Sequence, residues 1–275
     1  MCATCGCGEA SQTHQHPPDH AHEHGHDHEQ GHAHDHEHEH VMPDGKVVRH
    51  VHAAASPVAE RESRRIRVEE DILARNDVLA DVNRRMLAHA GTFAVNMMSS
   101  PGSGKTTLLV KTLQLLAGTP MAVIEGDQQT DLDAKRIEAT GVKAVQINTG
   151  KGCHLDAAMV GGALEKVPLG PKGLLFIENV GNLVCPASFD LGENKKVVVV
   201  SVTEGEDKPL KYPDMFAVAD LVLVNKVDLV PHLEFDVRLL EANVHRVRPG
   251  VPILRVSAKT GEGFAPWLAW LQQRS

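Results

Sequence analysis

The arrangement of apolar and polar residues changes character along the chain. Residues 14–40 contain almost no apolar side chains. From about Ser63, apolar residues recur at three- and four-residue steps as far as Gly91, which predicts one long helix. From residue 92 onward, short β-prone apolar runs alternate with segments of helical spacing. This alternation indicates an α/β fold, in which a mostly parallel sheet is flanked by helices.

The predicted elements can be assigned to residue ranges. We expect strands at 92–98, 121–126, 143–148, 173–178, 196–203, 220–225 and 252–257. We expect helices between them, at 108–116, 131–140, 155–167, 234–247 and 263–273. In such sheets, ligands bind at the carboxyl ends of the strands. The residues directly after each strand are therefore the candidates for function.

Composition narrows the class of protein. The 275 residues suffice for one α/β domain with an appendage, and 42% of them are hydrophobic, as in ordinary soluble proteins. A net charge of −8 argues against non-specific binding of nucleic acid. The chain has no apolar run of about 18 residues and no signal-peptide pattern at its N-terminus. We therefore expect a cytoplasmic protein without a membrane span.

The N-terminal region is rich in metal-ligating residues. Cys2, Cys5 and Cys7 lie close enough in sequence for their thiolates to face one cation such as Zn²⁺ or Ni²⁺. Residues 14–40 hold 12 of the 18 histidines, interleaved mostly with Asp, Glu, Gly and Ala, and such a tract cannot bury a core, so we expect disorder. Uncharged imidazoles bind divalent metals. The predicted weak storage ligands are His20, His22, His24, His26, His28, His32, His34, His36, His38 and His40. An affinity tag is the alternative, although tags are usually uninterrupted histidines.

Residues 99–107, Ser-Ser-Pro-Gly-Ser-Gly-Lys-Thr-Thr, lie between a predicted strand and a predicted helix. Glycines let the backbone point N–H groups at phosphate oxygens, and the helix N-terminus adds partial positive charge. We expect Lys105 to reach the β- and γ-phosphates and Thr106 to hold Mg²⁺. The candidate phosphate-binding residues are Gly102, Ser103, Gly104, Lys105, Thr106 and Thr107. The alternative is an ordinary turn rich in small residues.

Two further strand ends carry acidic residues. Asp127 is placed to hold Mg²⁺ or to orient the attacking water, so it joins Lys105 as a candidate catalytic residue. Capping of the next helix is the alternative role for Asp127. Glu178 and Gly181, in Glu-Asn-Val-Gly, fit a second carboxylate and γ-phosphate sensor of nucleotide-switch proteins. Together with the phosphate loop, these motifs predict a P-loop NTPase.

The last two strand ends predict the base. In Asn225-Lys226-Val227-Asp228, the Asp228 carboxylate can accept hydrogen bonds from guanine N1–H and its amino group, while Lys226 covers the ring. Adenine lacks this donor pair and would leave the carboxylate unpaired. Ser257, Ala258 and Lys259 supply a backbone N–H for guanine O6. The predicted nucleotide is GTP.

Cys153, His154 and Cys185 also follow predicted strands, at the same end of the sheet as the triphosphate. They can supply three ligands to one ion. Because Cys185 follows the γ-phosphate sensor, hydrolysis would move it. The alternative is two structural thiols and a solvent-facing histidine.

Over residues 1–8 and about 63–275, these motifs together resemble the HypB family of hydrogenase nickel incorporation proteins, GTPases of the SIMIBI class. The resemblance implies a GTP-hydrolysing nickel metallochaperone that delivers nickel for assembly of the NiFe hydrogenase active site. It also implies a GTP- and metal-dependent homodimer, a HypA-type nickel and zinc accessory protein and a hydrogenase large subunit precursor as partners. Cys2, Cys5 and Cys7 would form a tight nickel site. Cys153, His154 and Cys185 would form a weaker nickel or zinc site at the dimer interface.

We therefore predict a cysteine metal motif at 1–8, a His-rich disordered tail and linker at 9–62, and a GTPase domain with its N-terminal helix at 63–275. Three alternatives remain at this point. A nickel storage or detoxification protein would depend mainly on the histidine tract. A nucleotide kinase is disfavoured by the Asn-Lys-Val-Asp motif, and a urease maturation GTPase by the cysteine motifs.

Overall fold

The computed structural model describes residues 36–41, 46–52, 57–127, 132–150 and 152–273. It divides into two compact units with a boundary between Asp71 and Ile72, and each unit is described by itself.

The first unit contains an antiparallel pair of strands, β1 (His36–Val41) and β2 (Val47–His52), in which His36 is opposite His52. These strands lie within the range 9–62, for which the sequence predicts a disordered tail and linker. The valines of β2 favour extended backbone. Helix α1 (Pro57–Ala90) also begins earlier than the predicted Ser63, since Pro is well suited to the first helical position.

The second unit is built on a parallel sheet of order β5-β4-β6-β3-β7-β8-β9. Each predicted strand range is confirmed as a strand of this sheet, with ends that differ by one or two residues at β3, β4, β7, β8 and β9. The strands are β3 (Thr92–Ser99), β4 (Met121–Asp127), β5 (Lys143–Asn148), β6 (Gly173–Glu178), β7 (Lys195–Ser201), β8 (Leu221–Asn225) and β9 (Ile253–Arg255). The phosphate-loop strand β3 therefore lies at the centre of the sheet.

Helices connect the strands, and the sequence analysis identified the longer ones. These are α2 (Lys105–Leu115), α3 (Leu132–Glu138), α4 (Ala157–Leu164), α8 (Val237–Val247) and α9 (Phe264–Gln272). Four short helices were not predicted: α5 (Cys185–Ser188), α6 (Lys208–Lys211), α7 (Pro213–Ala217) and the 3-10 helix η1 (Val227–His232). Each is shorter than two helical turns, so periodicity gives little signal. Among the described residues, no helix is both long and apolar enough to cross a bilayer.

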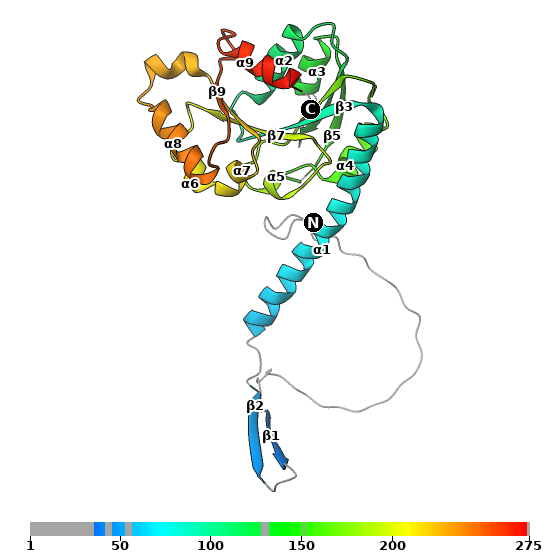
Figure 1. Ribbon diagram of the computed structural model, residues 1–275, viewed down its shortest axis with the longest axis vertical. Helices are drawn as coiled ribbons and strands as arrows, with labels where there is room; N and C mark the ends of the chain where they lie inside the picture. The colour runs from blue at the N-terminus through cyan, green and yellow to red at the C-terminus, as the bar shows by residue number, and fades with distance from the viewer. Residues whose placement is uncertain (1–35, 42–45, 53–56, 128–131, 151, 274–275) are drawn as a thin grey trace. The chain divides into compact units, whose positions relative to one another are not determined.

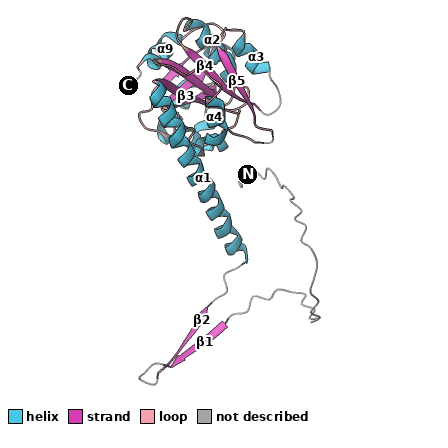
Figure 2. Cartoon of the chain, turned by 90° about the vertical axis from the view of Figure 1, so that its right-hand side faces the viewer, coloured by secondary structure: helices cyan, strands magenta, loops and turns pink. Residues whose placement is uncertain are grey.

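Both faces of this sheet are covered by helices (Figures 1 and 2). On one face, Val95 and Met97 of β3 pack in a cluster with α2, α3 and α9, which includes the fully buried Trp267. On the other face, Ala94 packs with α4 and the end of α1, and Met98 packs with α7 and α8. Because side chains alternate along a strand, burial on both faces explains why β3 reads as a continuous apolar run.

The second half of α1 is fixed to the sheet domain by two buried asparagines. The Asn83 side-chain amide donates to the Ala157 carbonyl at 2.8 Å and to the Leu191 carbonyl at 3.0 Å. The Asn76 amide donates to the Asp190 carbonyl at 2.7 Å and accepts from the Ala157 N–H at 2.9 Å. The apolar periodicity predicted that this helix packs on the domain, but it gave no sign of these polar contacts.

Candidate functional site

The phosphate loop connects the central strand β3 to α2. Gly102 and Gly104 have φ of 76° and 89°, a left-handed conformation that glycine adopts without strain. A β-carbon on Gly104 would lie only 2.7 Å from Asn225 Nδ2, so glycine is required there also for space. Above the loop is a cavity of about 540 Å³, lined by residues 99–107, 125–127, Asp133, Arg136, Glu178, Val180, Gly181 and Lys226.

Glu178 lies at the floor of this cavity and is almost fully buried. Its Oε1 accepts from Lys105 Nζ at 2.8 Å and from Thr106 Oγ1 at 2.6 Å. The structure therefore brings together the predicted lysine, the predicted Mg²⁺ ligand and the predicted second carboxylate. The Lys105–Glu178 pair compensates two buried charges that would each be costly alone.

Glu125 adds a second buried carboxyl group to the cavity. Burial, together with the nearby carboxylates of Glu178 and Asp127, raises the pKa of Glu125 to about 8. Within the described part of the chain, Glu125 Oε2 and Glu178 Oε2 have no hydrogen-bond partner. Carboxylate and hydroxyl oxygens, including those of Thr106 and Asp127, are the donors that Mg²⁺ prefers. This donor set fits a magnesium ion.

Two residues of α3 line the same cavity and were missed by the sequence analysis. Asp133 Oδ2 accepts from Thr106 Oγ1 at 3.0 Å. Arg136 donates to Thr107 Oγ1 at 3.0 Å and pairs with Asp133 at 3.0 Å. Asp133 does not follow a strand directly but lies in the first turn of α3, and an acidic residue in the first turn of a predicted helix is the signal that points to it.

A second cavity of about 270 Å³ adjoins the phosphate loop and is lined by Gly104, Thr107, Asn225, Lys226, Asp228, Leu229, Ala258 and Lys259. Asn225 connects its walls, since Nδ2 donates to the Ser103 carbonyl at 2.9 Å and Oδ1 accepts from the Ala258 N–H at 3.2 Å. Ser257 Oγ donates to Asp228 Oδ1 at 2.6 Å and holds that carboxylate. Lys226 Nζ donates to the Gly102 carbonyl at 2.6 Å. The predicted base-binding residues thus form one pocket.

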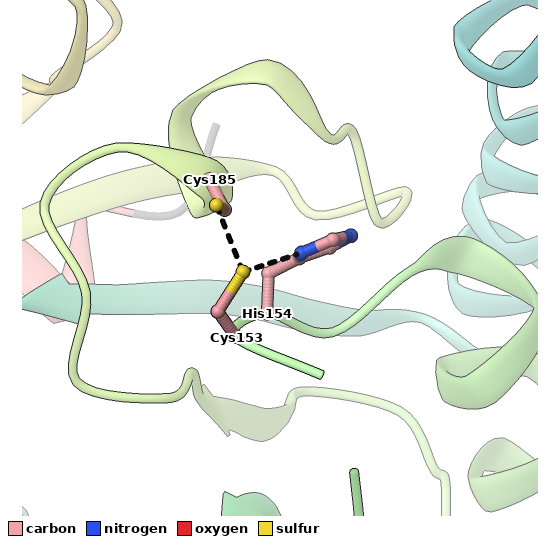
Figure 3. A group of neighbouring side chains, drawn as sticks. All are labelled: Cys153, His154 and Cys185. Carbon is pink, nitrogen blue, oxygen red and sulfur yellow. Dashed lines mark hydrogen bonds between the residues drawn. The ribbon is translucent and has the colours of Figure 1, made fainter. Parts of the chain in front are cut away.

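Cys153, His154 and Cys185 converge beside this sheet edge, and their ligand atoms lie within 4.8 Å of one another (Figure 3). Cys153 Sγ is 2.8 Å from Cys185 Sγ and 3.6 Å from His154 Nδ1. The sulfur–sulfur distance exceeds the roughly 2.05 Å of a disulfide bond. Thiolate and imidazole are the ligands that Zn²⁺ and Ni²⁺ accept. The alternative of a solvent-facing histidine is not supported.

The His154 ring is held in place for such a role. It stacks on Phe189 with ring centroids 4.0 Å apart. Burial lowers the pKa of His154, although the Asp156 carboxylate opposes that change. The neutral imidazole, which is the form that binds metals, is therefore favoured near neutral pH.

Some predicted residues lie outside the described part of the chain. These are Cys2, Cys5, Cys7 and the storage histidines as far as His34. His36, His38 and His40 are located on β1, where only the backbone is described.

Comparison with known proteins agrees with this geometry. Residues 93–255 match the family model described as "CobW/HypB/UreG, nucleotide-binding domain". The hydrogenase maturation factor HypB of Azotobacter chroococcum mcd 1 is 62% identical over 214 residues, which is 78% of this chain and 70% of that protein. That of Escherichia coli K12 is 48% identical over 285 residues and covers 99% of this chain and 98% of its own length.

A solved structure is similar as well. The crystal structure of HypB from Helicobacter pylori in complex with nickel has 40% sequence identity and a TM-score of 0.69, and the match covers 72% of this chain and 94% of that one. The family match, the two curated relatives and this structure agree with one another. The chain therefore belongs to the CobW/HypB/UreG family and, within it, to the HypB hydrogenase maturation factors.

Proposed function

We propose that this protein is a GTP-hydrolysing nickel metallochaperone that delivers nickel for assembly of the NiFe hydrogenase active site. One observation carries the proposal. Three sites share one edge of the sheet: the phosphate cavity, the base pocket and the cluster of two cysteines and a histidine. Cys185 of this cluster lies only seven residues after Glu178 of the phosphate cavity. The relatives are named hydrogenase maturation factors, and one similar structure contains nickel, which supports this assignment.

On the nucleotide side, each residue has a chemical task. Lys105 neutralises the charge that develops on the β–γ bridge during hydrolysis. Asp127 orients the attacking water, and Thr106 with Asp127 would hold Mg²⁺, which supplies further charge stabilisation when it is bound. Asp228 is half-buried and held by Ser257, and it selects guanine, since a base without the donor pair would desolvate this carboxylate without donating to it.

On the metal side, Cys153, His154 and Cys185 supply three ligands, and a tetrahedral ion takes four. A fourth donor from a second protomer, or from a receiving protein, would complete the site and provide a route for transfer. This arrangement is consistent with a homodimer, with a HypA-type accessory protein and with a hydrogenase large subunit precursor as the final acceptor. Cys2, Cys5 and Cys7 would form the separate, tighter nickel site.

A nickel storage protein is the second candidate, because 12 histidines in residues 14–40 could hold several ions. Deletion of residues 14–40 separates the two functions. If the protein stores nickel, the deletion should remove most of the bound nickel and the protein's storage or detoxification role in cells. Delivery predicts that hydrogenase activity persists in cells supplied with ordinary nickel.

The direct test uses the full chain with Cys2→Ser, Cys5→Ser and Cys7→Ser, so that the remaining thiols are Cys153 and Cys185. Sulfur-to-nickel charge-transfer absorption then reports only this cluster, because histidines give no thiolate band. Nickel is titrated with GDP or with a non-hydrolysable GTP analogue present, and GTP hydrolysis is measured separately. We expect hydrolysis and a nickel affinity that depends on the nucleotide. Absence of either hydrolysis or a thiolate band would refute the proposal.

A further inference from the structure

Cys153 and His154 are followed by Leu155, which contacts the ends of two strands that line the phosphate cavity, β4 and β6. We call residues 152–157 the metal loop. Within it, Leu155 comes directly after His154 and is fully buried. Its backbone N–H donates to Asn179 Oδ1 at 3.1 Å, and Asn179 comes directly after Glu178. A β-carbon on Gly126 would lie 2.8 Å from the Leu155 side chain, so this side chain rests on the backbone of β4.

These contacts connect the metal loop to the acidic residues of the phosphate cavity. Gly126 lies between Glu125 and Asp127, and all three line that cavity. Glu178 holds Lys105 and Thr106. A displacement of either strand end therefore acts on Leu155 and, through the adjoining backbone, on Cys153 and His154.

Asn179 is the more constrained of the two contacts because both polar atoms of its side chain form hydrogen bonds. Oδ1 accepts from Leu155 N–H and also from Val180 N–H at 3.0 Å. Nδ2 donates to Asn96 Oδ1 at 3.3 Å, in the middle of β3. Its exposure is 0%, so a lost partner leaves a polar group desolvated. The amide therefore cannot release Leu155 without cost, and the two segments move together.

We propose that Asn179 is a positioning residue that couples the γ-phosphate end of the nucleotide site to the geometry of the Cys153–His154–Cys185 cluster. This inference rests on the proposed function. Cys185 lies six residues beyond Asn179 on the same segment, whereas Cys153 and His154 are reached through Leu155. When Glu178 exchanges Lys105 or Thr106 for another partner, Asn179 thus determines whether Cys185 on one side and Cys153 and His154 on the other move together. Coupling of this kind is measured as a ratio of metal affinities in the two nucleotide states.

Asn76 provides a matched control. Like Asn179, it is a buried asparagine whose Oδ1 accepts a backbone N–H of the metal loop, that of Ala157 at 2.9 Å. Its own amide donates to the Asp190 carbonyl at 2.7 Å. Asn76→Ala therefore removes the same kind of bond from the same loop, but from α1 rather than from a nucleotide strand end.

The experiment uses the full chain with Cys2→Ser, Cys5→Ser and Cys7→Ser as parent, and adds Asn179→Ala or Asn76→Ala. Nickel dissociation constants are measured from the thiolate band with GDP and with a non-hydrolysable GTP analogue. Coupling of the usual size would give the parent a ratio on the order of 5–150-fold. We expect the ratio to fall to about 1 in Asn179→Ala and to persist in Asn76→Ala, because only the former connects the loop to Glu178.

An undiminished ratio in Asn179→Ala overturns the inference. If that variant no longer binds GDP, Gly126→Ala replaces it, because the added β-carbon would lie 2.8 Å from Leu155 Cγ and Cδ2 and must displace the residue through which Asn179 reaches the metal loop. An unchanged ratio in Gly126→Ala would likewise overturn the inference. A parent that hydrolyses GTP and binds nickel with equal affinity in both states overturns the coupling while leaving both activities established. A parent without hydrolysis or without the thiolate band refutes the proposed function itself.

Discussion

The phosphate cavity and the metal cluster differ in the kind of atom that they present. The cavity offers hydroxyl and carboxylate oxygens from Thr106, Glu178 and Glu125. The cluster offers two sulfurs and an imidazole nitrogen. Hard cations such as Mg²⁺ prefer the former, and softer ions such as Ni²⁺ and Zn²⁺ prefer the latter. Mg²⁺ in the cavity and Ni²⁺ or Zn²⁺ at the cluster can therefore bind at the same edge of the sheet without competing for one site.

The two sites also differ in what supports them. The carboxyl groups of the phosphate cavity, Glu125 and Glu178, lie at the ends of central strands, β4 and β6, which are paired with neighbours on both sides. The metal ligands are on connecting segments, Cys153 and His154 between β5 and α4 and Cys185 at the start of the four-residue α5. Sites on regular elements are more rigid than sites on loops. The metal cluster is thus the part whose geometry can change at least cost.

The largest expected effect separates the two sites by removing the cavity's lysine. Lys105→Ala should lower kcat for GTP hydrolysis by about 10²–10³-fold, because a charge that stabilises the transition state is lost. It also leaves the buried Glu178 carboxylate without its cation. Kinetic assays with saturating GTP measure the loss. Nickel binding at the cluster without nucleotide should be unchanged. A parallel loss of the thiolate band would show that the sites are not separable.

The converse change removes a metal ligand. Cys185→Ala should weaken nickel binding at the cluster by at least about 10–100-fold, since even partners of metal ligands contribute that much. GTP hydrolysis without metal should be retained, because Cys185 does not line the phosphate cavity. Titration of nickel in the background without N-terminal cysteines measures the affinity. Hydrolysis that falls together with nickel affinity would contradict the division between the two sites.

A third change weakens a support close to the metal loop. Asn83→Ala removes donors from the buried Ala157 and Leu191 carbonyls and should lower the free energy of unfolding by about 1–3 kcal/mol. Urea denaturation followed by circular dichroism measures this change. Lys211→Ala is the control, because its pair with Asp207 is exposed and surface pairs contribute little. Equal effects of the two substitutions would mean that Asn83 does not anchor α1.

The phosphate-binding and base-binding residues could be predicted from the sequence because they belong to short motifs. In each motif, the spacing of the residues suits contact between the backbone and one ligand. Asn225 and Gly104 illustrate this, since they touch one another although they are far apart in sequence. Asn76, Asn83 and Asn179 could not be found in this way. Their roles depend on which segments the fold places together, and a buried asparagine has no local pattern. The pairing of β1 with β2 likewise depends on residues outside the histidine tract, whose own composition gives no sign of a strand.

The smallest expected effect concerns the ion pair between Arg84 of α1 and Asp190. Asp190 is also the residue whose carbonyl accepts from Asn76. Burial raises the pKa of Asp190, but the hydrogen bond from the Gly192 N–H and the pair with Arg84 outweigh it, and the pKa is lowered. A carboxyl whose pKa is depressed on folding contributes stability above its unfolded pKa, about 3.9 for Asp, and loses it as the pH falls through the folded value. The pair is partly exposed, so solvent screens it.

Asp190→Asn keeps an oxygen that can accept from the Gly192 N–H but removes the charge. We expect this substitution to destabilise the fold by less than about 1 kcal/mol near pH 7. The difference from the parent should vanish once the pH is well below 3.9, because the parent carboxyl is then protonated as well. Urea denaturation at several pH values measures this difference. A difference that persisted at low pH would show that Asp190 acts through geometry rather than charge.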